Sequence, residues 1–234
     1  MWGAGPETIK RWYAKGYRTL KDLEDHVKDL NRQQNVGLKY YHEFEQRIPR
    51  SEVAQLEAYV RAAAEEVDSR LYCETCGSYR RGAETCGDID ILITHLDGDG
   101  MEGLLDKIVN KLTSVGFLTD HLSRGRHGGA QEHNKYMGVC HVPPPQGSGV
   151  HRRIDIQLIP LETWPFALLY FTGSGYFNRS MRLWARRHRY QLSDKGLFPK
   201  YNEDLVGPCV PCKTEKDIFD ALGLDYKEPH ERTV

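Results

Sequence analysis

The sequence lacks several features that are typical of particular classes of protein. No apolar run approaches the roughly 20 residues that span a bilayer, and the N-terminus MWGAGPETIK has no apolar core of a signal peptide. We find no internal repeat and no low-complexity tract. Neither sign of charge is in excess, because 32 Lys and Arg residues nearly balance 33 Asp and Glu residues. A membrane protein and a uniformly basic nucleic-acid binder are therefore disfavoured.

The balanced total hides a local asymmetry in charge. Residues 179–189, RSMRLWARRHR, hold five arginines and one histidine without an acid, whereas residues 214–234 are mainly acidic. A one-sided basic surface that contacts nucleic acid therefore remains open.

The six cysteines include two C-x-x-C pairs, Cys73 with Cys76 and Cys209 with Cys212. Four thiolates at these spacings could in principle form a zinc site. Because more than 130 residues separate the pairs, free thiols in a reducing, intracellular compartment are the simpler interpretation.

Hydrophobic periodicity predicts an α+β fold in which a helical segment is followed by a mixed sheet and a smaller α+β end. Pro6 suits the first turn of the first helix and Gly16 its end, and Asn31 and Ser51 suit N-caps. Helices are expected at 7–15, 18–27, 31–46, 51–67, 103–115, 162–171, 174–188 and near 214–223. Strands are expected at 70–75, 88–94, 116–122, 135–142 and 152–160. A glycine-rich polar loop is expected at 123–135.

Two aspartates share one face of an expected strand. Because side chains alternate along a strand, Asp88 and Asp90 project together, while Ile89, Ile91 and Ile93 face the other way. Two unpaired carboxylates on one face repel each other. Either the strand is a solvent-exposed edge, or divalent cations neutralise the pair, and Mg²⁺ prefers such oxygen ligands.

A third aspartate favours the metal interpretation. Asp155 lies on the expected strand HRRIDIQLIP, which shows the same apolar alternation. If the two strands are neighbours, three carboxylates could hold two metals roughly 4 Å apart, as in displacement reactions at phosphorus.

The residues before Asp88 suit the phosphates of a substrate. Gly77 and Ser78 end one strand and open a short helical turn, from which Arg81 projects. Gly87 allows the backbone to approach a ligand. Taken alone, Arg80 and Arg81 would be read as a solvated basic turn.

These residues also carry a resemblance to a known family. Gly77-Ser78, nine residues, and then DIDI resembles the signature of the nucleotidyltransferase superfamily. More narrowly, CGSYRRGAETCGDIDILITH, HRRIDIQLIP, YFTGSGYFNRSMR and RIPR are similar to segments of the family X DNA polymerases. The resemblance runs in order from Trp2 to about Arg232, so it covers essentially the whole chain.

The resemblance implies three subdomains. They are a helical DNA-binding subdomain with a partial helix-hairpin-helix motif at 1–49, a nucleotidyltransferase palm with a mixed β-sheet at 50–160, and a small α+β subdomain that binds the nascent base pair at 161–234. Family members carry a preceding lyase domain. No equivalent precedes Trp2, so we expect no lyase activity and weak binding to gapped DNA.

The resemblance also assigns the chemistry. Asp88, Asp90 and Asp155 are implied to hold two Mg²⁺ ions, for which Mn²⁺ can substitute, and Asp155 is implied to accept the proton of the primer 3′-hydroxyl. The triphosphate-binding residues that the resemblance implies are Arg47, Gly77, Ser78, Arg81 and Gly87.

Further residues are implied to contact the sugar, the base and the DNA. Tyr170, Phe171 and Gly173 match residues beside the incoming sugar, and Asn178 matches a residue at the minor-groove edge of the new base pair. The DNA-binding residues implied by the resemblance are Gly3, Ala4, Gly5, Arg153 and Arg182, and a monovalent cation is expected at the hairpin. Without the family, Tyr170 and Phe171 would be read as a core pair and the hairpin as an ordinary helix start.

The function favoured by these residues is template-directed DNA synthesis from deoxynucleotides. The resemblance implies a monomeric, nuclear enzyme that fills gaps in primer-template DNA during repair; the sequence does not indicate its protein partners. Two alternatives stay open. One is a template-independent terminal transferase, since the loop at 123–135 lies where such relatives differ, and the other is a noncatalytic module that binds DNA ends.

Overall fold

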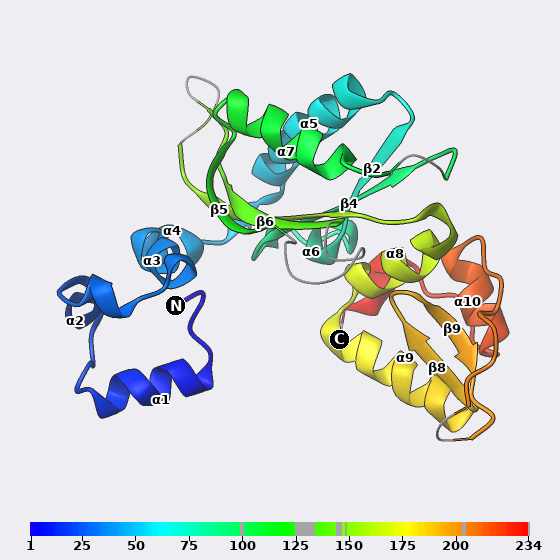
Figure 1. The fold of residues 1–234 in the computed structure, drawn as a ribbon. Helices are drawn as coiled ribbons and strands as arrows, with labels where there is room; N and C mark the ends of the chain where they lie inside the picture. Colours follow the sequence, from blue (N-terminus) through cyan, green and yellow to red (C-terminus); the bar gives the residue numbers. More distant parts are fainter. Residues whose placement is uncertain (99–100, 125–133, 144–146, 148, 203–204, 234) are drawn as a thin grey trace.

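A computed structural model describes residues 1–98, 101–124, 134–143, 147, 149–202 and 205–233. Most of the expected loop at 123–135 therefore lies outside the described residues. The fold is mixed α+β, as the sequence predicts, with one five-stranded sheet at its centre (Figure 1). Among the described helices, none combines the length and the apolar character needed to cross a bilayer.

The N-terminal part of the chain is helical. It contains α1 (Pro6–Ala14), α2 (Leu20–Glu24), the 3₁₀ turn η1 (Val27–Asp29), α3 (Arg32–Lys39) and α4 (Tyr41–Phe44). Asn31 caps α3 as predicted, with its side chain accepting a hydrogen bond from the Gln34 amide. The single helix expected at 31–46 is interrupted at Tyr40, whose backbone departs from helical geometry.

The central sheet has the strand order β2 (Leu71–Thr75), β4 (Ile89–His95), β7 (Arg152–Leu158), β6 (Lys135–Cys140) and β5 (Leu118–Arg124). Only β4 and β7 pair in parallel; the other pairs are antiparallel. Figure 1 shows α5 (Arg50–Val67) and α7 (Leu104–Ser114) over one face of the sheet and α6 (Gly77–Arg80) and α8 (Trp164–Thr172) near the other.

The strand that carries the paired aspartates lies inside the sheet and is covered on both faces. Ile89, Ile91 and Ile93 join the main core beneath α5 and α7. Leu92 is buried on the opposite face with Cys76 and Ala167. The alternative in which this strand is a solvent-exposed edge is therefore wrong, because apolar side chains remove both faces from water.

One predicted helix cap is also wrong. Helix α5 begins at Arg50, with Pro49 at the N-cap position, so Ser51 lies inside the first turn. Pro49 belongs to the two-residue strand β1 (Ile48–Pro49), which pairs with β3 (Thr85–Cys86). This pairing, which the sequence did not reveal, sets where the helix begins, since its first amide, that of Arg50, donates to the carbonyl of Glu84.

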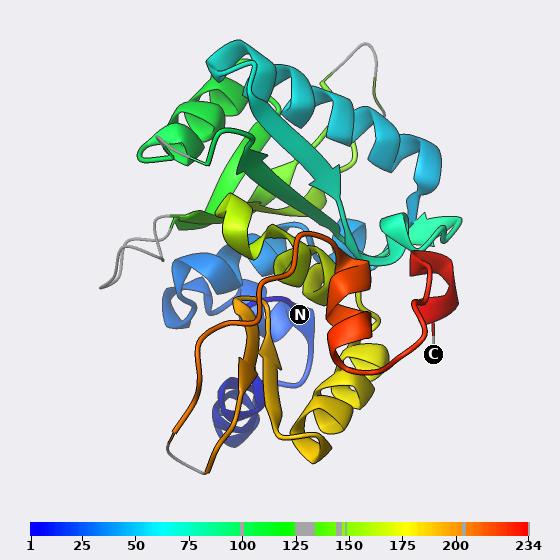
Figure 2. The same cartoon turned by 90° about the vertical axis from the view of Figure 1, so that its right-hand side faces the viewer.

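The C-terminal part has its own apolar cluster. It contains the 3₁₀ turn η3 (Leu161–Thr163), α9 (Gly175–Arg187), the hairpin of β8 (Tyr190–Ser193) and β9 (Gly196–Pro199), α10 (Glu215–Ala221) and the turn η4 (Pro229–Arg232). Figure 2 shows the hairpin beside α9. The core joins Phe166 and Leu169 of α8 to Leu197, Ile218 and Phe219.

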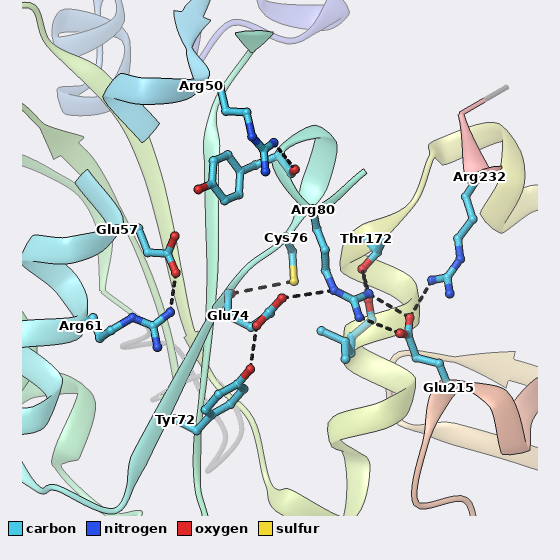
Figure 3. Close-up of polar contacts among 12 residues, drawn as sticks. Arg50, Glu57, Arg61, Tyr72, Glu74, Cys76, Arg80, Thr172, Glu215 and Arg232 are labelled. Atoms are coloured by element: carbon cyan, nitrogen blue, oxygen red, sulfur yellow. Dashed lines mark hydrogen bonds and ion pairs between the residues drawn. The ribbon is translucent and has the colours of Figure 1, made fainter. Parts of the chain in front are cut away.

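A cluster of charged side chains joins this C-terminal part to α6 (Figure 3). Glu215 accepts hydrogen bonds from Arg80 Nη2 at 2.8 Å and from Arg232 Nη1 at 2.6 Å. Arg80 also donates to Thr172 Oγ1 and Glu74 Oε1. The side chain of Arg80 is only 16% exposed and its guanidinium is paired with the buried Glu215, so the reading of Arg80 as a solvated surface residue is wrong.

Removing the central carboxylate should destabilise the protein. In Glu215→Gln, the loss of negative charge leaves two arginines without their shared partner, at a cost of about 3 kcal/mol. Urea denaturation should therefore show a clearly lowered midpoint. The matched control is Asp220→Asn on the same helix, which removes an exposed ion pair with Lys216 and should leave the midpoint nearly unchanged. Equal midpoints for the two variants would contradict this account.

Candidate active site

The parallel pairing of β4 and β7 brings two of the three aspartates together. Asp90 lies directly opposite Asp155 in the register, with Ile89 opposite Ile154 and Ile91 opposite Ile156. Asp155 is 8% exposed, whereas Asp88, one residue before β4, remains exposed to solvent. The carboxylates therefore lie at the beginning of β4 and on the adjacent residue of β7, with Asp88 at the surface.

Burial and mutual repulsion change the acidity of these carboxylates. The pKa of Asp90 is raised to about 7, first by burial and then by the negative charges of Asp88 and Asp155. Burial also raises the pKa of Asp155, although the nearby Arg153 opposes that change. A site with these properties lacks positive charge, which a bound cation would supply.

Arg153 provides part of that positive charge. Its Nη2 lies 3.3 Å from Asp88 Oδ2 and 3.5 Å from Asp155 Oδ1, so the guanidinium bridges the two carboxylates. In the part of the chain that the structure describes, no three His, Cys, Asp or Glu side chains converge closely enough to hold a metal ion. The resemblance implies that Arg153 contacts DNA, and this stays a prediction; in the structure its side chain lies beside the aspartates.

A cavity of about 600 Å³ opens beside Asp88 and Asp90. It brings together side chains and backbone from the N-terminal part, the sheet and the C-terminal part. Its lining includes all five residues expected to bind triphosphate and all four expected to bind sugar and base, which are Arg47, Gly77, Ser78, Arg81, Gly87, Tyr170, Phe171, Gly173 and Asn178. Arg182 of α9 also lines it.

Arg81 has unused capacity for an anion at this cavity. Its Nη1 donates to the Thr172 carbonyl at 2.6 Å, but its buried Nε has no hydrogen-bond partner among the described residues. Burial lowers the pKa of Arg81, because desolvation penalises the cation. A phosphate oxygen would satisfy this guanidinium.

Arg47 reaches the cavity across the small β1–β3 sheet. Its Nη2 donates to the Thr85 carbonyl at 2.6 Å and its Nε donates to the Thr85 hydroxyl at 3.2 Å. A Cβ at Gly87 would lie 3.2 Å from Arg47 Nη1, so a larger residue there would press on this arginine. The glycine before Asp88 therefore makes room for Arg47 as well as for a ligand.

The C-terminal wall of the cavity is aromatic and amide-bearing. Tyr170 and Phe171 lie edge to face at the end of α8, with ring centroids 5.1 Å apart. The Asn178 side chain donates to the Tyr170 carbonyl at 2.6 Å, and the Arg182 guanidinium lies 6.0 Å from the Tyr170 ring. Because Tyr170 is 37% exposed, it is not the buried core residue of the alternative interpretation.

Gly3, Ala4 and Gly5 do not line the cavity. Gly3 has a left-handed φ of +80° and its carbonyl accepts a hydrogen bond from Gln34 Nε2, while Gly5 is the N-cap of α1. The preceding residue, Trp2, does contact a residue beside the aspartates, because its ring centroid lies 5.3 Å from the Arg153 guanidinium carbon.

The sequence did not single out every residue of the site. Thr172, Ser174, Gly175 and Arg179 also line the cavity. Thr172 and Ser174 are neighbours of residues that were chosen, and Arg179 belongs to the basic run at 179–189. Proximity in the sequence to the predicted residues could have indicated Thr172 and Ser174, and the basic run could have indicated Arg179.

The cysteines of the two C-x-x-C pairs contribute to different parts of the fold. Cys73 belongs to the main core, Cys76 to the cluster between the sheet and α8, and Cys212 to the C-terminal cluster. Burial raises the pKa of the Cys73 thiol to about 12.

Comparison with known proteins agrees with this geometry. The DNA polymerase beta palm matches residues 47–161, the DNA polymerase beta thumb matches residues 167–233, and the fingers domain of DNA polymerase lambda matches residues 1–45. The chain is 44% identical over 239 residues to DNA polymerase lambda of Rattus norvegicus and 39% identical over 243 residues to DNA polymerase lambda of Arabidopsis thaliana.

These alignments include 99% and 100% of this chain. They include 41% of the rat protein and 45% of the plant protein, so the chain spans less than half the length of these relatives. Along the chain the fingers, palm and thumb matches follow one another without a large gap. The chain therefore belongs to family X of the DNA polymerases, the family of polymerases beta and lambda.

Proposed function

We propose that this chain is the catalytic region of a template-directed DNA polymerase, which adds deoxynucleoside monophosphates to a primer 3′-hydroxyl. One observation carries the proposal. A single cavity joins the arginines and glycines suited to a triphosphate with Asp88 and Asp90 on one side and Tyr170 and Phe171 on the other. Membership of the family supports the same conclusion.

The triphosphate is proposed to lie against Arg47, Ser78 and Arg81. The two guanidiniums offer charge-assisted hydrogen bonds, and the Ser78 hydroxyl lies in the same lining. Gly77 and Gly87 keep the backbone side of the cavity open for the phosphates.

The donor chemistry of Asp88, Asp90 and Asp155 fits divalent cations, because carboxylates are hard oxygen donors. In the described structure Arg153 bridges two of these carboxylates and the three do not converge on one point, so cation binding is proposed to displace Arg153 and draw them together. The pKa of Asp90 is raised by burial and then by the charges of Asp88 and Asp155. Two Mg²⁺ ions, or Mn²⁺ in their place, would lower the pKa of the primer hydroxyl there and stabilise the leaving pyrophosphate. Asp155 would accept the hydroxyl proton. Arg153 must leave the carboxylates, which makes it available to the primer backbone.

The C-terminal wall is proposed to select the sugar and check the base pair. Tyr170, Phe171 and Gly173 would crowd a ribose 2′-hydroxyl. Asn178 and Arg182 would face the minor groove and the template, where acceptors are nearly independent of sequence. The contact between Asn178 and the Tyr170 carbonyl supports a shared role, because it fixes the two side by side.

The remaining parts of the proposal rest on the family. Residues 1–49, 50–160 and 161–234 are proposed as the three subdomains, and Gly3, Ala4 and Gly5 as a hairpin that grips a DNA phosphate with a monovalent cation. The biological setting is proposed as gap-filling repair in the nucleus by a monomer.

The decisive experiment is primer extension by an Asp155→Asn variant. This change keeps the shape of the side chain but removes one ligand and one proton acceptor, so Mg²⁺-dependent extension should fall by about a thousandfold. Asp106→Asn, on the exposed first turn of α7, is the matched control and should extend normally. Unchanged extension by Asp155→Asn, with the fold intact by circular dichroism, would refute the assignment.

Substrate choice tests the other part of the proposal. The wild-type protein should extend a primer across a one-nucleotide gap and on a recessed end, with deoxynucleotides preferred to ribonucleotides. It should not extend a single strand. Efficient extension of the single strand without template would instead identify a terminal transferase.

A glycine pair tests the geometry around Asp90. Gly77 has φ +58°, and a Cβ there would lie 3.1 Å from Asp90 Oδ2. Gly77→Ala should therefore cost about 1 kcal/mol of stability and also weaken Mn²⁺ binding, measured by electron paramagnetic resonance, because Asp90 is displaced.

Gly82→Ala is the control for that variant. Gly82 has φ +83°, and a Cβ there meets no atom within 4 Å in the described part of the chain. It should show a similar loss of stability with unchanged Mn²⁺ affinity. Equal Mn²⁺ affinities for the two variants would show that contact with Asp90 does not matter.

A further inference from the structure

Trp2 connects the N-terminal segment to the catalytic strands. It packs against the small cluster of Val36, Tyr40, Leu122 and Val139, against which Met137 also packs. Met137 of β6 lies directly opposite Asp155 of β7 in the sheet register. Trp2 therefore shares an apolar cluster with the residue that pairs with the third aspartate.

The backbone around Trp2 is held closely against α3. A Cβ at Gly37 would lie only 2.3 Å from the Trp2 carbonyl oxygen, so this approach requires glycine at position 37. Gln34 Nε2 donates to the Gly3 carbonyl at 3.2 Å, and Gln33 Nε2 donates to the Leu122 carbonyl at 3.0 Å. These contacts fix the position of Trp2 relative to the sheet.

The indole contacts Arg153, the residue that bridges two catalytic carboxylates. The guanidinium carbon lies 5.3 Å from the Trp2 ring centroid, within the range of a cation–π interaction. On its other side, Nη2 reaches Asp88 and Asp155. The buried Nε of Arg153 has no hydrogen-bond partner in the described residues, so the aromatic face is a principal contact opposite the carboxylates.

We propose that Trp2 is a positioning residue that holds Arg153 between Asp88 and Asp155, and that the strength of this contact sets how tightly a divalent cation binds there. The inference rests on the proposed function, since it concerns the same carboxylates. Arg153 and a divalent cation carry charge of the same sign and use the same oxygens, so they compete. Weakening the contact that holds Arg153 there should therefore increase the affinity of the carboxylates for a divalent cation.

The test measures binding of Mn²⁺ alone, by electron paramagnetic resonance, to variants of the full chain. Trp2→Leu keeps an apolar side chain against this cluster but removes the aromatic face. It should lower the Mn²⁺ dissociation constant about fivefold, which corresponds to a cation–π contribution of about 1 kcal/mol. Trp2→Phe retains an aromatic face and should stay near the wild-type value.

A double-mutant cycle shows whether Trp2 acts through Arg153. Arg153→Ala should itself bind Mn²⁺ more tightly, and adding Trp2→Leu to it should then have no further effect. A merely structural role for Trp2 would weaken Mn²⁺ binding and would do so in both backgrounds. Trp12→Phe, a change of a buried tryptophan of α1 that belongs to a separate apolar cluster with Leu23 and Leu30, should leave Mn²⁺ binding unchanged.

The outcomes separate this inference from the proposed function. An unchanged or raised dissociation constant in Trp2→Leu, or an effect that persists without Arg153, would overturn the role of Trp2. Primer extension by the wild-type protein, measured in parallel, reports on the polymerase activity. If the wild-type protein extends primers but Trp2→Leu does not act on Mn²⁺ binding through Arg153, only the inference about Trp2 is overturned. If Trp2→Leu acts in this way but the wild-type protein does not extend primers, only the proposed function is overturned.

Discussion

The parallel pairing of β4 with β7 is the constraint on which the candidate active site depends. It sets Asp90 opposite Asp155, although 64 positions in the sequence lie between them. The register is fixed by the isoleucines that alternate with these aspartates, because a slip by one residue would carry the carboxylates into the core and the isoleucines out of it. Burial of the isoleucines on one face of each strand thus determines which aspartates lie opposite each other on the other face.

This arrangement concentrates negative charge where water is scarce. The protein compensates in part with Arg153, while burial and then the charges of Asp88 and Asp155 raise the pKa of Asp90. Arg81 is the complementary case, a cation whose pKa burial lowers and whose Nε lacks a partner among the described residues. A phosphate anion would pair with Arg81, and its accompanying cations would neutralise the aspartates. The arginines and the carboxylates therefore suit one cavity.

Much of the fold was predictable from the sequence because its elements follow local rules, and local patterns also singled out Gly77, Ser78, Arg81 and Gly87 of the cavity. The five strands follow from apolar alternation, and the cap at Asn31 follows from its side chain. Ser51 failed as a cap because β1, only two residues long, positions the start of α5 through a pairing with β3. Such a short strand leaves no periodic signal.

The misreading of Arg80 has a different cause. An arginine next to a turn looks exposed in a sequence, and only tertiary structure shows that Glu215 is its partner. The contact of Arg153 with two aspartates was likewise not visible in the sequence. The cavity residues from 170 to 182 were chosen through family resemblance, since aromatic residues at the end of an apolar helix otherwise suggest a core.

The charged junction at Glu215 has a consequence for exchanging parts between related proteins. Arg80 comes from the sheet region, whereas Glu215 and Arg232 come from the C-terminal part, and all three are removed from water together. A chimera that crosses over near residue 161 must therefore inherit compatible charges from both parents. Without Glu215, Arg80 would keep only Glu74 as an acidic partner within the described structure, so these distant positions are expected to be transferred as one unit.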